Sequence, residues 1–358
     1  MSHLRWGIIG CGQISFDFVQ AMRKCVHPHM IVAIAASNWE KAKNLKQVLC
    51  LGEGVTVYGS YEELLANANV EVVYIGLVNH VHHDIVIKAL NRDKHVLCEK
   101  PLGLNVRQVH GMVQKSRQKK LFLMEGFHSR FFPCWNQIRT DLENKTLGEL
   151  TSIHANIGSD YFSENRFHTP DGAKPIDSGS TPLMDFGLYT INFALWIFKD
   201  EMPQKIIAYG RKDETGADKF ANITLEFSKG KKAFLLYSAE DIMPNSAFIS
   251  CTDGHLLIPE FFHCPTRLIR VRGKQKVGEN SAEGIEFPLE DDAFYIYNNS
   301  SGLRYEADHV FECLRKGRKE SDLMSLETTE KLAEIIQEIR RQLDIVLPQD
   351  KQTNHDST

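Results

Sequence analysis

A lysine and a tyrosine are the residues of this sequence best suited to moving a proton. Lys100 stands in the run Cys98-Glu99-Lys100-Pro101, which follows an apolar segment typical of a strand. The carboxyl ends of strands are where open α/β sheets bind their ligands, and the proline fixes the turn after the lysine. We expect the ammonium to lower the pKa of a neighbouring hydroxyl. An ordinary solvated lysine before a proline is the alternative that this motif leaves open.

The tyrosine belongs to a second motif, which runs from Gly179 to Tyr189. Asp185 and Tyr189 are four residues apart, so we expect them on one face of a helix. A tyrosine titrates near about 10, so it can act as a base near neutrality only with help, which Lys100 would supply. The alternative is a buried tyrosine and an acid that serves the helix dipole.

A glycine-rich turn opens the chain and predicts a dinucleotide site. Gly10 and Gly12 follow an apolar strand and precede a helical pattern. Glycines at that point let backbone amides approach a pyrophosphate at the helix N-terminus, with Gln13 and Ile14 in the first turn. A tight turn would need glycine in any case, and Ser15 replaces the usual third small residue.

The tip of the second expected strand favours NADP over NAD. NAD enzymes usually place an acid there for the ribose 2′-hydroxyl, and this chain has Ser37 and Asn38 instead. These two residues can donate hydrogen bonds to a 2′-phosphate, and Lys41 can add positive charge. Alternatively, Ser37 and Asn38 only cap the helix that follows.

The elements around these motifs predict a doubly wound parallel sheet, that is, an N-terminal Rossmann domain over residues 1–125. The expected strands are Leu4 to Ile9, Ile31 to Ala36, Val72 to Gly76, His95 to Cys98 and Leu121 to Met124. The expected helices are Ser15 to Lys24, Trp39 to Leu49, Tyr61 to Ala66, His82 to Arg92 and Val106 to Lys119.

A different pattern follows and predicts a C-terminal α+β domain over residues 126–348, with a large, mostly antiparallel open sheet. Its strands are expected at Leu150 to Ile157, Lys205 to Tyr209, Ala221 to Phe227, Lys232 to Tyr237, Ala247 to Cys251 and Leu268 to Val271. Helices are expected at Leu183 to Phe198, Tyr305 to Lys316 and Leu326 to Leu343, before a polar, flexible tail over residues 349–358.

Composition narrows the function classes. The 358 residues suffice for two domains, and 42 basic against 46 acidic residues, without a basic run, argue against nucleic acid. The apolar runs are too short to span a bilayer, and no secretion signal is visible. The eight cysteines show no metal-binding spacing. We therefore expect a cytoplasmic protein with reduced thiols.

The motifs together carry a resemblance to a known family. They include L-R-W-G-I from Leu4, Y-G-S-Y-E-E-L from Tyr58, V-L-C-E-K-P from Val96, L-F-L-M-E from Leu121, R-F-F-P from Arg130, T-L-G-E-L from Thr146, D-F-G-L-Y from Asp185, Y-E-A-D-H-V from Tyr305, C-L-R-K-G from Cys313 and P-Q-D-K ending at Lys351. On these, nearly the whole chain resembles the glucose-fructose oxidoreductase and inositol dehydrogenase (Gfo/Idh/MocA) family, and within it the dimeric, NADP-linked members that oxidise dihydrodiols and D-xylose.

The resemblance implies roles for residues in both motifs. Lys100 and Tyr189 match the family's catalytic lysine and tyrosine, Asp185 matches the acid one turn earlier, and Glu99 and His82 match positions that line the cofactor. It also implies a homodimer. The full set expected at the cofactor is Gly10, Gly12, Gln13, Ile14, Ser37, Asn38, Lys41, Leu77, Asn79, His82, Glu99 and Lys100.

Three positions depart from those relatives. Ser37 stands where they carry arginine, His128 where they carry tryptophan, and Ser180 where they carry the second of two glycines. We expect His128 and Arg130 to face the substrate, so the chemistry should be kept while the substrate can differ.

These expectations combine into an NADP-dependent dehydrogenase that oxidises a secondary alcohol of a diol or an aldose, with Tyr189 as base and Lys100 as its assistant. No metal is expected, because His82 and His83 are adjacent and would point apart on a helix. Two other classes stay open: a non-catalytic NADP-binding sensor, and an interaction protein that uses the second sheet.

Overall fold

The chain forms two compact units, described here from a computed structural model. The structure describes residues 2–160, 175–273, 281–290 and 293–351. The first unit contains residues 1–103, 107–132 and 289–330, and the second contains residues 104–106, 133–288 and 331–358. This grouping differs from the contiguous ranges 1–125 and 126–348, because residues 289–330 return to the first unit.

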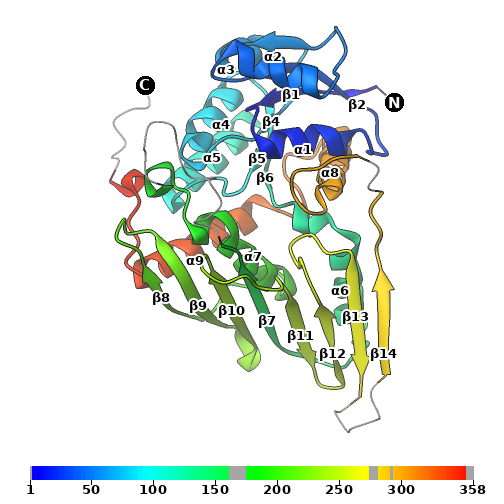
Figure 1. Cartoon of the computed structure of the whole chain (residues 1–358), viewed down its shortest axis with the longest axis vertical. Helices are drawn as coiled ribbons and strands as arrows, with labels where there is room; N and C mark the ends of the chain where they lie inside the picture. The colour runs from blue at the N-terminus through cyan, green and yellow to red at the C-terminus, as the bar shows by residue number, and fades with distance from the viewer. Residues whose placement is uncertain (1, 161–174, 274–280, 291–292, 352–358) are drawn as a thin grey trace. The chain divides into compact units, whose positions relative to one another are not determined.

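The first unit is built on a six-stranded parallel sheet with the order β3-β2-β1-β4-β5-β6, which is the Rossmann order (Figure 1). The predicted doubly wound fold is confirmed. Its strands are β1 (Leu4–Ile9), β2 (His29–Ala35), β3 (Thr56–Tyr58), β4 (Val72–Ile75), β5 (His95–Glu99) and β6 (Leu123–Gly126). Its helices are α1 (Gln13–Met22), α2 (Trp39–Val48), α3 (Tyr61–Ala66), α4 (His82–Asn91), α5 (Val106–Lys119) and α8 (Leu303–Arg315).

Aromatic packing fixes α1 against the centre of this sheet. The ring of Phe18 on α1 stacks on Tyr74 of β4 with centroids 3.8 Å apart, and its edge meets Trp6 of β1. All three side chains are fully buried. Burial of this much aromatic surface, together with the contacts of α8 with α1, holds the amino end of α1 at the edge where β1 and β4 end.

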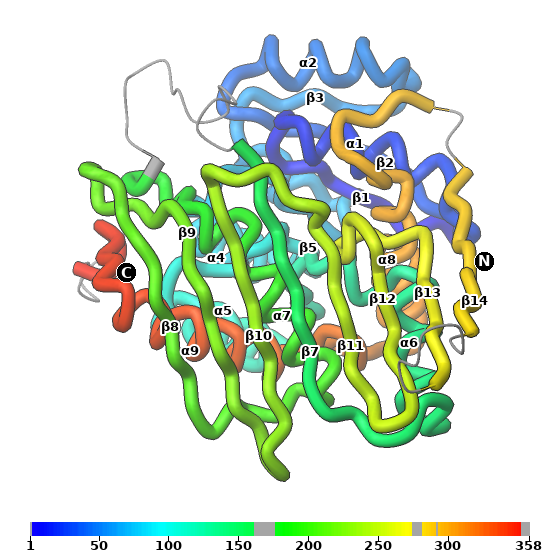
Figure 2. The backbone as a smooth tube through the Cα atoms, turned by 60° about the horizontal axis from the view of Figure 1, so that its bottom comes forward, coloured from blue at the N-terminus to red at the C-terminus, as the bar shows by residue number. Residues whose placement is uncertain are grey.

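The second unit is an open eight-stranded sheet with the order β14-β13-β12-β11-β7-β10-β9-β8, in which β7 and β10 are parallel and the other neighbours antiparallel (Figure 2). This confirms the expected sheet. Its strands are β7 (Leu150–Gly158), β8 (Lys205–Lys212), β9 (Asp218–Glu226), β10 (Lys232–Ser238), β11 (Ala247–Cys251), β12 (Gly254–Ile258), β13 (Arg267–Arg272) and β14 (Ser281–Glu286). Its helices are α6 (Pro133–Glu143), α7 (Leu188–Ile197) and α9 (Leu326–Gln342), of which α9 begins within the first unit.

The helices cover one face of this sheet, and the other face carries no helix in Figure 2. Along β7, Ile153, Ala155 and Ile157 are buried, whereas His154 between them is exposed. Strand periodicity therefore separates an apolar inner face from an open outer face.

Several elements differ from the expectations. Strands β3, β12 and β14 and helix α6 were not predicted, and the helix expected from Leu183 begins with a π-helical turn over Leu183–Gly187. The tail was expected to be flexible from Gln349, but Gln349 is buried and Asp350 forms an ion pair with Arg340 (2.8 Å). Residues 352–358 lie outside the described part of the chain. Among the described residues, no helix is long and apolar enough to cross a membrane.

Candidate functional site

The turn between β1 and α1 has the backbone that the glycine-rich motif requires. Gly10 has φ +98°, and a Cβ there would lie 2.3 Å from the carbonyl oxygen of Gly76, so only glycine fits. Ser15 occupies the position of the third small residue of the glycine-rich motif. Its hydroxyl contacts the same carbonyl at 3.4 Å. Helix α1 begins at Gln13 with no side-chain cap and no acid in its first turn, which leaves its amide groups available to an anion.

A hollow of about 210 Å³ opens beside this turn. Three residues expected at the cofactor line it: Gly12, which caps α1, Gln13 in α1, and Lys41 in α2. Its lining residues are Cys11, Gly12, Gln13, Phe16, Lys41, Asn44, Leu45, Val48 and Ile296. A lining that mixes apolar and polar residues is typical of small-molecule sites. Ile296 is far away in sequence and was not predicted to lie here.

The residues after β2 partly bear out the alternative interpretation, in which they cap the helix that follows. The Asn38 side-chain oxygen accepts hydrogen bonds from the amides of Glu40 (2.8 Å) and Lys41 (3.4 Å), so Asn38 caps α2. Its NH₂ group can still donate. Ser37 is exposed and hydrogen-bonds Tyr61 of α3, whose pKa is raised by burial. Tyr61 thus joins the polar groups at this strand end, although no role was assigned to it within the motif Y-G-S-Y-E-E-L.

Lys100 follows β5 directly, and its peptide bond to Pro101 is cis. The adjacent Glu99 is buried and accepts a hydrogen bond from the Tyr74 hydroxyl at 2.8 Å. Burial raises the pKa of Glu99, while the Lys100 ammonium and the Tyr74 hydroxyl oppose that rise. Lys100 is therefore preceded in the chain by a buried carboxyl group that interacts with its charge.

Two further buried acids lie in the same unit and were missed from the sequence. Glu306 of α8 is fully buried, and among the described residues neither of its oxygens has a hydrogen-bond partner. Burial and the Glu99 charge raise its pKa well above the ordinary value. Glu125 accepts the Leu102 amide (2.9 Å), and burial raises the pKa of Glu125 from 4.5 to about 7. Such groups cluster at functional sites, and both lie in motifs quoted above, Glu125 in L-F-L-M-E and Glu306 in Y-E-A-D-H-V, to which no role was assigned.

Two residues expected to line ligands are turned into the protein. His82 is fully buried, and its two ring nitrogens contact the carbonyl oxygens of Pro101 (2.9 Å) and Leu77 (3.0 Å). It therefore holds the loop after β4 against the turn after Lys100. Arg130, which was expected to face the substrate, is also fully buried and donates to the Leu323 carbonyl at 2.9 Å.

Three further expected residues of the first unit lie in helical turns. His128 is half-buried, and its ring meets the edge of Phe132 with centroids 5.9 Å apart. Ile14 is half-buried in the first turn of α1. Asn79 is buried in the short helix after β4.

In the second unit, Tyr189 lies in the first turn of α7 and is 9 % exposed. Asp185 lies in the preceding π-helical turn, so the pair does not share the regular α-helical face that was expected. The buried carboxylate of Asp218 accepts the Leu183 amide at 2.7 Å and thereby fixes the start of this turn. Gly187 follows, where a Cβ would lie 2.8 Å from the Tyr237 ring.

A histidine that the sequence did not single out lies against Tyr189. The rings of Tyr189 and His263 have centroids 5.1 Å apart, and His263 Nδ1 is buried. The preceding Phe262 is fully buried, and its carbonyl accepts the Trp135 indole at 2.8 Å. Phe261 has φ +46°, a strained conformation for a bulky residue. The loop is thus built to place His263 beside Tyr189.

Two groups of described residues bring metal-ligand atoms within 4.8 Å of one another: Cys25, His29 and Asp308, and His309, Cys313 and Asp322. In the first, the Trp6 indole donates to His29 Nδ1 at 2.9 Å. The proton of neutral His29 is then on Nε2, which faces Asp308, so no lone pair is left for a metal. The absence of a metal stays a prediction.

In the second group, Arg318 already supplies the positive charge beside Asp322, at 2.7 Å. This arrangement does not require a metal ion for charge balance.

Comparison with known proteins identifies the family of this chain. Residues 4–127 match the model described as "Oxidoreductase family, NAD-binding Rossmann fold", and residues 135–257 match the GFO/IDH/MocA C-terminal domain. The chain belongs to the Gfo/Idh/MocA family of oxidoreductases. The resemblance inferred from the motifs is confirmed.

Individual relatives cover the whole chain. Trans-1,2-dihydrobenzene-1,2-diol dehydrogenase of Xenopus laevis is 38% identical over 96% of this chain and 99% of its own, and the Homo sapiens enzyme of that name is 37% identical over 97% and 99%. Among solved structures, aldose-aldose oxidoreductase from Caulobacter crescentus has a TM-score of 0.78 at 21% identity over 96% of this chain and 98% of that one. A 3-ketoreductase from Actinomadura kijaniata with NADP and TDP-benzene has a TM-score of 0.77 at 23% identity over 95% and 98%. These two structures share the fold.

Replacing Glu125 by glutamine should remove a pH-dependent loss of stability. The folded state holds the Glu125 proton up to a pKa of about 7, against 4.5 when unfolded. Stability is therefore full below pH 4.5, falls by about 3 kcal/mol as pH rises to about 7, and falls no further on this account above it. A glutamine side chain cannot ionise, and its amide oxygen can still accept the Leu102 amide.

Urea denaturation of both proteins across this pH window measures the difference. The free energy of unfolding of wild type should decline relative to Glu125→Gln, and Glu53→Gln, at an exposed carboxylate, is the control for removing a charge. A difference between wild type and Glu125→Gln that stays constant with pH would contradict the prediction.

Proposed function

We propose that this protein is an NADP-dependent dehydrogenase that oxidises a secondary alcohol of a small diol or aldose. Membership of an oxidoreductase family supports redox chemistry. The observation that carries the proposal is Tyr189, an almost buried phenol fixed at the start of α7 in a chain that also keeps Lys100 at the end of β5.

The residues of this chain handle the proton. When bound, the nicotinamide accepts the hydride from the carbinol carbon. Lys100 stabilises Tyr189 as the tyrosinate, which takes the proton of the reacting hydroxyl and becomes a neutral phenol, while Asp185 orients Lys100 or the substrate. The Lys100 ammonium in turn favours the ionised form of the adjacent Glu99, because opposite charges stabilise each other.

The dinucleotide would lie along the glycine-rich turn, with its pyrophosphate at the uncapped start of α1. The absence of an acid at the end of β2, together with Ser37, the Asn38 amide, Lys41 and Tyr61, favours the 2′-phosphate of NADP. Neutral donors bind phosphate less strongly than a bidentate arginine, so the preference over NAD should be modest.

The substrate class follows from two imidazoles. His128 in the first unit stands where dihydrodiol-oxidising relatives carry tryptophan, and His263 lies beside Tyr189 in the second. Imidazoles offer hydrogen bonds and less apolar area than an indole. We infer that polyhydroxylated aldoses such as xylose react better than flat aromatic diols.

The eight cysteines are all free thiols, which is consistent with the reducing cytoplasm. Cell fractionation would test this localisation.

The open face of the eight-stranded sheet is the proposed homodimer interface. On it, His154 stacks on Phe234 (4.8 Å between centroids), and Phe248 lies between His154 and His255 (6.2 and 4.6 Å). Eight strands give a face of roughly 34 Å across, enough for the about 800 Å² per partner of a stable complex. A second copy can bury the same aromatic row on both sides.

Tyr189→Phe should lower kcat roughly 10²- to 10⁴-fold with NADP⁺ binding little changed, because only the general base is lost. NADPH absorbance is followed with a panel of xylose and other aldoses, a naphthalene dihydrodiol and dicarbonyls. Val26→Ala, at a side chain that is 84% exposed in the first unit, is the control. Wild-type turnover in Tyr189→Phe removes it from the mechanism, and a dihydrodiol that outperforms every aldose contradicts the role of the two histidines. No turnover with any substrate would favour a sensor.

Cofactor preference gives a separate test. We expect kcat/KM to be higher with NADP⁺ than with NAD⁺, and the ratio to increase in Ser37→Arg, because a guanidinium binds the 2′-phosphate in a bidentate way. Steady-state assays of both proteins with both cofactors measure it. A clear preference of wild type for NAD⁺ would refute the cofactor assignment.

Assembly is tested by sedimentation velocity. Wild type should be a dimer at micromolar concentration, and Phe234→Glu should shift it toward monomer, since a carboxylate in a buried interface loses its hydration. Phe234 is 39% exposed; the control is Val26→Glu, which changes a side chain that is 84% exposed in the other unit. A fully active wild-type monomer would exclude the dimer.

A further inference from the structure

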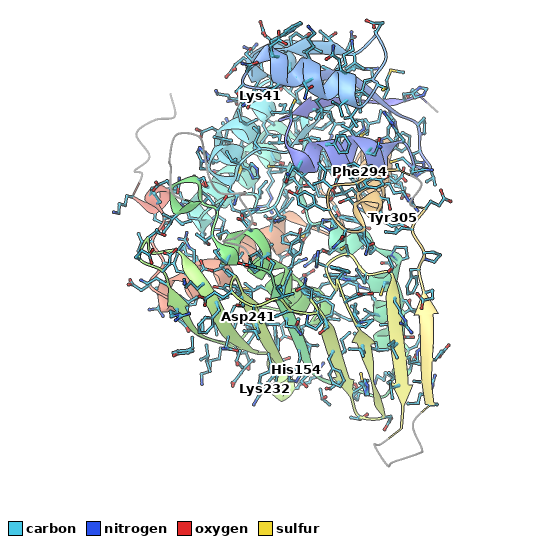
Figure 3. The ribbon with its side chains drawn as sticks, viewed as in Figure 1. Lys41, His154, Lys232, Asp241, Phe294 and Tyr305 are labelled. Carbon is cyan, nitrogen blue, oxygen red and sulfur yellow. The ribbon has the colours of Figure 1, made fainter. Side chains whose placement is uncertain are left out.

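A segment from late in the sequence lies across the amino end of α1. Residues 293–299, called here the strap, belong to the same compact unit as the glycine-rich turn. Phe294 lies beside α1 in Figure 3, and its ring packs edge-on against Phe16 with centroids 6.2 Å apart. Ile296 lines the hollow beside the turn. Almost 280 residues separate the strap from the helix that it contacts.

Asp17 anchors the strap. Its carboxylate is fully buried and accepts the amides of Ile296 (2.8 Å) and Tyr297 (2.9 Å). A buried carboxylate must be compensated, and two hydrogen bonds from backbone amides do so strongly. The strap therefore cannot leave α1 without exposing or stranding this charge.

A second attachment reaches the residue that begins α1. The Tyr297 hydroxyl donates to the Gln13 side-chain oxygen at 2.7 Å, at the exposed side of the helix. Gln13, Phe16 and Asp17 are spaced by three and four residues, so one face of α1 receives the whole strap. That face adjoins the uncapped helix start where a pyrophosphate is expected.

We propose that the strap retains the dinucleotide, with Tyr297 as a positioning residue that holds Gln13 and Ile296 as the apolar wall of the hollow. This inference rests on the proposed dinucleotide site. Gln13 has a long, flexible side chain, and ordering it before binding lowers the entropy cost of any contact that it makes. The strap acts on binding, and the proton chemistry at Tyr189 does not pass through it.

The test is the rate at which NADPH leaves, followed by its fluorescence in a stopped-flow instrument. Tyr297→Phe removes one hydroxyl and should raise the Kd for NADPH roughly threefold to tenfold, mostly through faster dissociation. Ile296→Ala, which removes no hydrogen bond, should also speed dissociation. Val26→Ala, at a side chain that is 84% exposed, is the control, and thermal unfolding checks that each variant folds.

A double-mutant cycle separates this role from a general structural one. If Tyr297 acts through Gln13, then Tyr297→Phe should have almost no further effect on dissociation in a Gln13→Ala background. Additive effects, or unchanged dissociation in folded Tyr297→Phe and Ile296→Ala, would overturn the proposal. Wild type that binds neither NADPH nor NADH would instead contradict the proposed function, so the two failures are distinguishable.

Discussion

The close approach of the β1–α1 turn to the end of β4 is the constraint on which the first unit depends. Gly10 adopts φ +98° within contact of the Gly76 carbonyl, and Ser15 contacts that carbonyl from α1. Any side chain at Gly10 would push the helix away from the sheet. The stacking of Phe18 on Tyr74 and the hollow beside Gly12 both require α1 to remain where this turn places it.

The same helix links the parts of the first unit that are far apart in sequence. One face of α1 carries Phe18 into the sheet, and its buried Asp17 binds the strap. Helix α8, which follows the strap, packs on α1 and brings Glu306 near Glu99. A single helix thus places the expected pyrophosphate site, its covering segment and a buried acid, which explains why residues 289–330 group with the Rossmann sheet.

The sequence predicted the parts of this arrangement that depend on periodicity. Apolar runs located the central strands, and Tyr61–Ala66 and Val106–Lys119 were predicted to the residue. Strand β3 has only three residues, too few for a pattern, and α6 begins at a proline after a short helical turn. The burial of His82 and Arg130 could not be foreseen, because the carbonyl groups that bind them, those of Leu77, Pro101 and Leu323, carry no side-chain signature.

The buried acids in the same unit as Lys100 lower the stability of the fold. Glu125 and Glu306 are buried with raised pKa values, and a hydrophobic residue at Glu306 would avoid the loss of hydration. Burial raises the pKa of Glu99 as well, but Lys100 and the Tyr74 hydroxyl both oppose that rise. The raised pKa values favour the protonated forms of these acids, so the burial that lowers stability also limits the negative charge around Lys100.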